Sequence, residues 1–411
     1  MKPFSLALCL VLFKVVLAVN VTEVSARQDW PWSPKVYLDC TLSGEGECDL
    51  DVSATWRGRS EPLALNPVNG LSGNCFGVSS GVVTLVWDPR EAGFSYTLSE
   101  VVFSVNAVTV DEHTFLVLDL VDGTHEWLPS VPDGGWTSEH KTTKMVFRRV
   151  PKGTFKMGIS SALKTFVGGI NDNREAEHNV TISHDYYLAI FPTTGSQAST
   201  INTGTANVTQ PSPASWSFNN LRGQYSDGVS WPSFGYTVSE TSLLKKLRDR
   251  FSGRFLFDLP TEAMWERAAR AESEGLWYAI DGFPGGGTVA ELGTYGSEST
   301  TNFLNAIASW YSNNANTSPL TEVGLKTPNK WGIYDMLGQS WEWCLDRENL
   351  SQLSDATDPV GGSATSDVNR MRRGGYATAI DKDLIIMRRV SWRPGGSWAF
   401  RFAIHLHKLV D

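Results

Sequence analysis

Short runs of alternating or continuous apolar residues dominate the first third of the chain. Such runs occupy residues 35–39, 82–87, 101–105 and 114–120, and Gly- or Asp-containing turns separate them. Apolar runs of this length, bounded by turn residues, are typical of strands. Several short strands at this spacing predict a β-sandwich over residues 19–135, similar to an immunoglobulin or fibronectin module.

The pattern changes after a polar stretch at residues 136–144, which predicts a linker. From residue 145 the chain reads as a strand, a turn and a second strand. Further on, residues 262–270 have the pattern of a helix, and Pro260 ends the strand before it. Thr261 can cap the first N–H groups of that helix, and Glu262 suits its positive end. A second domain is therefore predicted over residues 145–411.

The first eighteen residues have the composition of a secretory signal. Lys2 gives a positive start, an apolar run follows as far as Ala18, and small residues stand at the position of a cleavage site. The run is too short to cross a bilayer, and no later stretch comes close to the length of a membrane span. We expect residues 1–18 to be a signal peptide and the mature protein to be secreted, periplasmic or held in the cell envelope, with no membrane span.

Charge argues against a nucleic-acid partner. The chain has 35 Lys and Arg against 44 Asp and Glu, a formal net charge of −9. A protein that binds nucleic acid needs a basic face to neutralise phosphates. The one concentration of basic residues, at 245–250, reads as the solvated face of a helix. We expect no nucleic-acid partner.

Cysteines are few and offer no metal motif. Beyond Cys9 in the signal, the chain has Cys40, Cys48, Cys75 and Cys344, and none forms a CxxC pair, which disfavours structural zinc. Export permits disulfides, and Cys40 and Cys48 flank a Gly-rich turn across which they can pair. Three cysteines in one domain leave at least one unpaired, so the pairing stays open.

The first domain also contains a match to a hydrolase motif, which we interpret as a coincidence. Residues 77–81 match the hydrolase pattern G-x-S-x-G. That chemistry needs a helix directly behind the serine, whereas a β-type run follows here.

A series of blocks in the second domain resembles the formylglycine-generating-enzyme family, also called the sulfatase-modifying-factor family. The blocks are MVFRRVPKGTFKMG at 145–158, EHNVTIS at 177–183, DLPTEAMWERAAR at 258–270, PNKWGIYDMLGQSWEW at 328–343, RGG at 373–375 and FRFA at 400–403. Each block alone is weak, but their order along the chain matches the family. The resemblance implies an α+β fold: a β-sandwich module followed by an irregular C-type-lectin-like sulfatase-modifying-factor domain.

The resemblance also implies a test for catalysis. Family members that make formylglycine oxidise a substrate cysteine with a cysteine pair near the C-terminus, which holds copper(I), an ion that prefers soft thiolates. The corresponding window here, residues 384–390, contains Met387 but no cysteine. Copper is therefore not expected. Cys344 lies in a different block, where a packed thiol is the expected state.

Calcium is the cofactor that the resemblance favours. The family binds it in a loop before the WEW block through two side chains and two backbone carbonyls. Residue by residue, these positions fall on Asp335, Gly338, Ser340 and Glu342. Both side-chain ligands are oxygen donors, as calcium prefers. One departure is Gln339, where the family usually has Asn.

Two functions follow from these observations. The first is an exported pseudoenzyme that uses the domain for binding, with a glycan or a protein as ligand. The alternative is a metal-dependent oxidoreductase of the formylglycine-generating type that acts on a cysteine substrate. The missing cysteines and several altered family positions, such as Asp258 in place of Arg, favour the binding protein.

Overall fold

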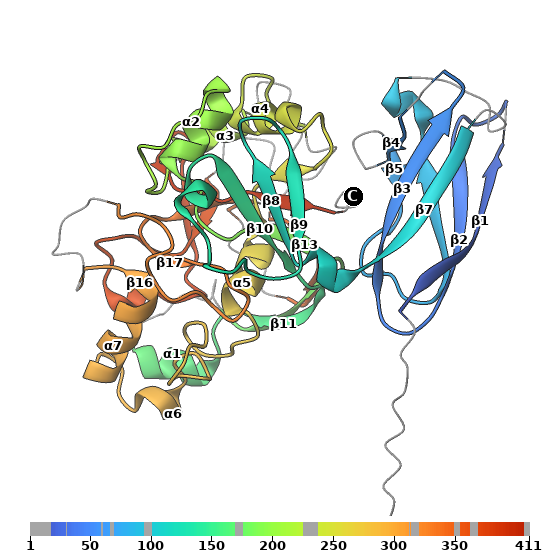
Figure 1. Ribbon diagram of the computed structural model, residues 1–411. Helices are drawn as coiled ribbons and strands as arrows, with labels where there is room; N and C mark the ends of the chain where they lie inside the picture. Colours follow the sequence, from blue (N-terminus) through green and yellow to red (C-terminus); the bar gives the residue numbers. More distant parts are fainter. Residues whose placement is uncertain are drawn as a thin grey trace, which may run out of the picture.

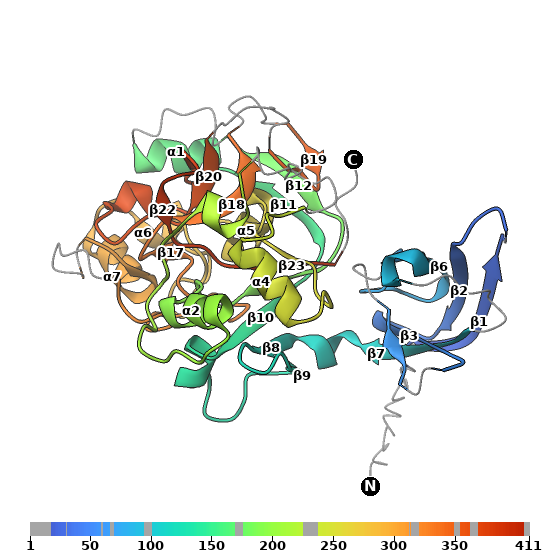
Figure 2. The same cartoon turned by 90° about the horizontal axis from the view of Figure 1, so that it is seen from above.

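The computed structural model describes residues 18–29, 31–58, 61–65, 70–93, 101–168, 176–224, 237–311, 313, 320–348, 354–361 and 369–406. The predicted signal peptide, apart from Ala18, lies outside the described residues. Two bodies stand side by side: a small all-strand domain and a larger domain of mixed helices and strands (Figures 1 and 2). No described helix is long and apolar enough to span a membrane.

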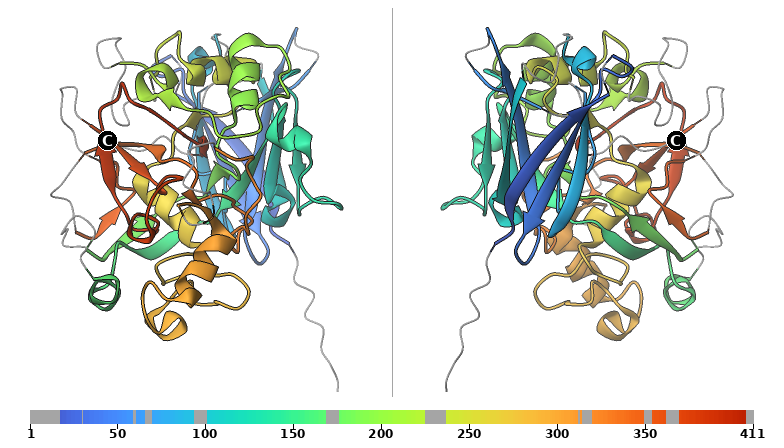
Figure 3. Two further views of the ribbon diagram at one scale, coloured as in Figure 1. Left: turned by 90° about the vertical axis from the view of Figure 1, so that its left-hand side faces the viewer. Right: turned by 90° about the vertical axis from the view of Figure 1, so that its right-hand side faces the viewer.

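The first domain is a sandwich of two antiparallel sheets. One sheet has the order β1-β2-β6-β5 and the other β4-β3-β7, and Figure 3 shows their long strands from the side. The strands are β1 Asn20–Gln28, β2 Val36–Ser43, β3 Cys48–Trp56, β4 Leu63–Ala64, β5 Leu71–Ser72, β6 Gly81–Trp87 and β7 Val101–Thr109. Alternate side chains of both sheets fill one apolar core, which confirms the predicted β-sandwich.

The disulfide considered between Cys40 and Cys48 is not formed. Both thiols are free and buried, as is that of Cys75. Strand β2 pairs with β1 and β6, whereas β3 pairs with β4 and β7. The turn between Cys40 and Cys48 therefore crosses from one sheet to the other instead of closing a two-stranded hairpin. In the G-x-S-x-G segment, strand β6 follows the serine, so no helix lies behind it.

The second domain is built on a six-stranded sheet with the order β15-β23-β13-β10-β8-β9. Its strands are β8 Phe115–Asp119, β9 His125–Leu128, β10 Lys144–Val150, β13 Tyr186–Ala189, β15 Phe257–Asp258 and β23 Ala403–His405. Strands β8 and β9 lie in the part of the sequence that we assigned to the first domain. Because β8 pairs with β10 from residue 115 onward, the boundary near residue 135 falls too late.

Shorter sheets and helices surround this sheet. The sheets are β11 Gly153–Met157 with β12 His178–Ile182 and β19 Ala356–Thr357; β18 Glu342–Arg347 with β20 Arg370–Arg373 and β21 Val390–Trp392; β14 Trp216–Ser217 with β22 Ser397–Trp398; and β16 Ala308–Ser309 with β17 Leu337–Gly338. The α-helices are α1 Ser161–Val167, α2 Gly195–Thr203, α3 Phe218–Leu221, α4 Leu243–Arg250, α5 Glu262–Arg270, α6 Val289–Leu292 and α7 Glu298–Ile307. Helices and strands thus mix irregularly, which confirms the α+β class.

Four 3₁₀ turns complete the described elements: η2 Pro89–Ala92, η4 Val110–His113, η5 Ser138–Lys141 and η8 Asp381–Asp383. Two of them bear on the predicted linker. Turn η5 lies inside residues 136–144 and packs on the second domain, with Lys141 and Thr142 buried. The chain passes between the domains at η4 instead, directly between β7 and β8.

An ion-pair cluster fixes the joint at η4. The carboxylate of Asp49 on β3 accepts hydrogen bonds from Nη1 and Nη2 of Arg149 on β10, at 2.5 and 2.8 Å. Nδ1 of His113 lies 3.0 Å from the same carboxylate, and Nε of Arg149 donates to Asp185 at 2.6 Å. All four side chains are buried. A bidentate pair of this kind sets the angle between the domains as well as their contact.

Candidate functional site

The four predicted calcium positions lie in one curled segment that runs from just before β17 to the first residue of β18. Asp335 has a backbone φ of 52° and Gly338 a φ of 80°. A Cβ atom on Gly338 would stand 2.3 Å from the carbonyl oxygen of Ser309, so only glycine fits there. The structure therefore brings together the segment that the sequence singled out: Asp335, Gly338, Ser340 and Glu342.

The carboxylate of Glu342 is already bound by a cation from the protein itself. Its Oε1 accepts from Nη2 of Arg401 at 2.7 Å, and its Oε2 accepts from Nε of Arg401 at 2.7 Å. Nε1 of Trp265 on α5 donates to Oε2 as well, at 2.8 Å. These three side chains are at most 2% exposed. The planar guanidinium thus forms a bidentate, buried pair with the carboxylate.

Arg401 also binds the backbone of this curled segment. Its Nη2 donates to the carbonyl of Tyr334 at 3.1 Å and to that of Asp335 at 3.3 Å. The side chain of Asp335 points elsewhere, because its Oδ2 accepts from the backbone N–H of Gly324 at 2.5 Å. Burial raises the pKa of Asp335 to about 6, so this carboxyl gives up its charge more easily than an ordinary aspartate.

The contacts that Glu342 already makes limit how calcium could bind at these four positions. Calcium takes six to eight oxygen ligands, but both oxygens of Glu342 already accept N–H groups, and a guanidinium stands beside them. As arranged, the oxygen atoms of this segment accept the N–H groups of a guanidinium. Calcium at the four positions stays a prediction, and metal analysis of the purified protein tests it. One calcium ion per chain would support the prediction, whereas a calcium-free chain with the same fold would contradict it.

A comparison of the sequence with protein-family models identifies the family of the second domain. The model for the sulfatase-modifying factor enzyme 1-like domain matches residues 136–399, which is most of the second domain. The chain belongs to the sulfatase-modifying-factor family. A search of curated proteins finds no match.

A comparison with solved structures finds similar chains. PvdO from Pseudomonas aeruginosa is 17% identical, with a TM-score of 0.44, and the match covers 63% of this chain and 94% of PvdO. Treponema denticola variable protein 1 is 19% identical, with a TM-score of 0.43, over 64% of this chain and 95% of that one. CarF is 14% identical, with a TM-score of 0.34, over 64% and 98%.

The window in which this family places its cysteine pair is filled with apolar side chains. Leu384, Ile385, Ile386 and Met387 are each at most 1% exposed and belong to the main core. Cys344 is fully buried, and burial raises the pKa of its thiol well above the ordinary value. A thiol of this kind stays protonated at neutral pH, so it lacks the thiolate that nucleophilic or metal chemistry requires.

Ion pairs fix the groups around this window. At the start of α5, the carboxylate of Glu262 accepts from Nη2 of Arg389 at 2.6 Å and from Nη1 of Arg373 at 3.3 Å. Arg373 also binds Glu266, one turn further along the helix. Arg373, Glu262 and Glu266 are at most 2% exposed. These acids and bases neutralise one another inside the protein, and the described arrangement assigns them a structural role.

Gln339, where the family usually has Asn, supports the curled segment. Its Oε1 accepts from the backbone N–H of Thr321 at 3.0 Å, and its Nε2 donates to the hydroxyl of the same residue at 2.7 Å. The longer side chain thus reaches a neighbouring loop.

A cluster of tryptophans around Arg372 stands out beside the filled window. The guanidinium of Arg372 on β20 lies 4.0 Å from the ring centre of Trp398, 4.7 Å from that of Trp392 and 5.2 Å from that of Trp341. Arg372 is 5% exposed, whereas Trp392 is 41% exposed. We call Arg372, Trp341, Trp392 and Trp398 the tryptophan cluster.

The tryptophan cluster has donors without acceptors. Among the described residues, the buried Nε and Nη1 of Arg372 and Nε1 of Trp398 have no hydrogen-bond partner. Burial lowers the pKa of Arg372 to about 10. Buried donors are nearly always satisfied in folded proteins, and an unsatisfied one costs about 1–3 kcal/mol. An acceptor brought by a ligand would remove that cost.

Sequence reasoning did not find this cluster, although a signal was present. Residues 392–398 contain two tryptophans that flank a Pro-Gly-Gly turn. Gly396 lets the two rings approach, because a Cβ atom there would lie 2.4 Å from the ring of Trp392. The sequence did not predict Arg372 as their neighbour, because the pairing of β20 with β21 is what brings it beside Trp392.

Proposed function

We propose that this protein is an exported binding protein whose sulfatase-modifying-factor domain is non-catalytic and holds an acidic glycan at the tryptophan cluster. The observation that carries the proposal is Arg372, a nearly buried arginine with two unpartnered N–H groups beside a partly exposed tryptophan. The sequence of residues 1–18 supports export. The apolar filling of residues 384–387 supports the loss of the family's oxidation chemistry.

The chemistry of the cluster favours a sugar that carries a carboxylate or a sulfate. Arginine binds planar or tetrahedral anions through several N–H groups at once. Flat tryptophan rings bury the C–H faces of a ring-shaped ligand and, through Nε1 of Trp398, provide one more donor. Trp392, which is 41% exposed, would be the first ring that a glycan of this class contacts. Movement of that ring on binding would open the buried donors of Arg372 to the acidic group.

The experiment compares binding of acidic and neutral saccharides to the mature protein. Isothermal titration with glucuronate-containing and sulfated oligosaccharides is run beside titration with their neutral counterparts. We expect the acidic members to bind and the Arg372→Met variant to lose at least tenfold in affinity. Arg27→Met is the matched control, because Arg27 is an exposed arginine of the first domain that pairs with Asp39.

Two results would overturn the proposal. One is equal binding of acidic and neutral saccharides. The other is unchanged affinity in Arg372→Met, since the proposed donors would then not contact the ligand. Failure of every saccharide, together with saturable binding of a purified protein at the same surface, would show a protein-binding domain instead.

A further inference from the structure

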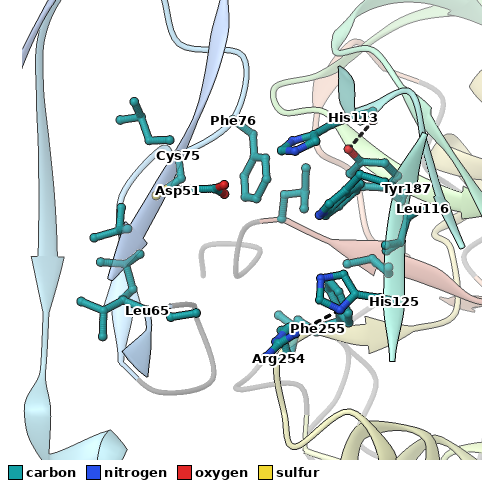
Figure 4. A pocket seen from close by; sticks show the side chains of 18 of the residues that line it. Asp51, Leu65, Cys75, Phe76, His113, Leu116, His125, Tyr187, Arg254 and Phe255 are labelled. Atoms are coloured by element: carbon teal, nitrogen blue, oxygen red, sulfur yellow. Dashed lines mark hydrogen bonds between the residues drawn. The ribbon is translucent and has the colours of Figure 1, made fainter. Parts of the chain in front are cut away.

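A cleft of about 350 Å³ separates the two domains beside the joint at η4. Figure 4 shows β3 and the loop that carries Phe76 on one side of this interdomain cleft, and the sheet of the second domain on the other. The volume lies in the range of small-molecule sites, which occur preferentially between domains. The ion pair of Asp49 with Arg149 holds the two walls together at one end.

The wall from the second domain is aromatic. The ring of Trp127 on β9 stacks on His113, with centroids 4.3 Å apart and planes at 29°. Phe255 packs against His125 at 5.3 Å and against Trp127 at 6.4 Å. Phe76 faces these rings from the first domain (Figure 4). Ring faces of this kind attract cations through their quadrupole.

The wall from the first domain presents a carboxylate. Asp51 lies two residues after Asp49 on β3, so both side chains point to the same face of the sheet. Asp49 is paired with Arg149, but Asp51 has neither a hydrogen bond nor an ion pair within the described part of the chain. Its direct neighbour across the sheet is Asn106 on β7, which also lines the cleft.

The positive groups that line the cleft form no ion pair with Asp51, although His113 lies close enough to lower its pKa. Arg254 donates from Nη1 to Nδ1 of His125, 3.0 Å away, and it stands against the wall opposite Asp51 (Figure 4). Burial, together with Arg254, lowers the pKa of His125, so this ring is neutral at pH 7. His113 bonds to Asp49, and Nε2 of His405 faces the carbonyl of Leu259 at 3.0 Å.

We propose that the interdomain cleft binds a small organic ammonium ion, with Asp51 as its counter-ion and Trp127 and Phe76 as its aromatic contacts. A cation there would form the ion pair that Asp51 does not make within the described residues, and the rings would contact the apolar part of the molecule. The side chain of Asp51 is exposed at the mouth of the cleft; the protein around it still raises the pKa of the carboxyl, and a bound cation would lower it again. This site is separate from the tryptophan cluster and does not depend on the function proposed for it.

The test uses two pairs of matched probes on the mature full-length protein. Choline is compared with its neutral isostere 3,3-dimethylbutan-1-ol, and phenethylammonium with 2-phenylethanol, by ligand-observed NMR titration. We expect at least one cation to bind ten times more tightly than its neutral partner. In Asp51→Asn this preference should fall to about one, while the neutral molecule keeps its affinity. Asp133→Asn, at an exposed aspartate elsewhere, is the control and should keep the preference.

Three outcomes would overturn the inference. If neither cation binds at millimolar concentration, the cleft does not bind small organic ammonium ions. A cation preference that survives in Asp51→Asn would place the charge recognition elsewhere. Unchanged cation affinity in Trp127→Leu, with the fold intact by circular dichroism, would exclude the aromatic wall. Saccharide binding at the tryptophan cluster should be the same in all these variants, so the two proposals can fail independently.

Discussion

The contact between Arg401 and Glu342 joins two segments that are 59 residues apart in the chain. The sequence analysis singled out both segments, that of Arg401 as a family block and that of Glu342 as a calcium loop. It did not predict that the two segments are in contact. No local pattern of apolar or charged residues encodes a pairing that depends on how β18 and β23 are placed. Residue identities at a candidate site could therefore be predicted, whereas their partners could not.

Replacing Arg401 with methionine should destabilise the second domain strongly. The change leaves the carboxylate of Glu342 buried without its counter-charge, and breaking a buried pair in this way typically costs about 3–5 kcal/mol. Urea unfolding followed by circular dichroism measures the loss. Lys330→Met is the matched control, because the pair of Lys330 with Glu272 is exposed and should contribute little.

A second change separates charge from packing. Adding Glu342→Gln to Arg401→Met removes the unpaired charge, so the double variant should be more stable than the single one. Equal stability of the two variants, or a single variant as stable as the wild type, would contradict the account of this pair.

At the scale of helices and strands, local patterns predicted several elements of the fold. The strands predicted at residues 82–87, 101–105 and 114–120 are confirmed, because they overlap β6, β7 and β8, and the capped helix is confirmed as α5. The assignment of β8 to the first domain was wrong. An apolar run such as FLVLD has the same appearance whichever sheet it joins, because its partners β9 and β10 lie further along the chain.

The cap of α5 gives a prediction at this scale. The side chain of Thr261 accepts from the backbone N–H of Met264 at 3.1 Å. Thr261→Ala removes that acceptor and should lower the free energy of unfolding by about 1 kcal/mol, whereas Thr261→Ser keeps it and should change little. Urea denaturation of the two variants measures the difference. If serine and alanine behave alike at this position, the hydroxyl does not act as the cap.

At the scale of the whole molecule, the joint between the domains depends on Asp49 and Arg149, which are 100 residues apart. The expected linker at residues 136–144 was misplaced for the same reason. A polar stretch predicts exposure, but here Lys141 finds a partner in Glu322 at 2.9 Å, and the segment packs as η5. Domain boundaries follow long-range pairing, which composition does not reveal.

Asp49→Asn should loosen the joint. Limited proteolysis is expected to cut faster between residues 109 and 115, and small-angle scattering should show a larger radius of gyration. Asp51→Asn is the control, because it lies on the same strand and face but makes no ion pair within the described residues. Equal proteolysis of both variants would contradict a coupling through Asp49.

The joint should also weaken in acid. Burial raises the pKa of Asp49, but hydrogen bonds from His113 and Arg149 lower it further, so the net pKa lies below the ordinary value. A carboxyl of this kind stabilises the folded state above its unfolded pKa of about 3.9, and the stabilisation is lost as the pH falls through the lower folded value. The difference in proteolysis rate between wild type and Asp49→Asn should therefore persist at pH 7 and shrink below about pH 4.

The absence of turnover is the claim on which the account depends most. The measurement is mass spectrometry of a cysteine-containing sulfatase peptide after incubation with the mature protein, copper(I) and oxygen, beside an active formylglycine-generating enzyme. We expect the active enzyme to convert the peptide and this protein to leave its cysteine unchanged. Copper-dependent conversion by this protein would contradict the account of a domain retained for binding.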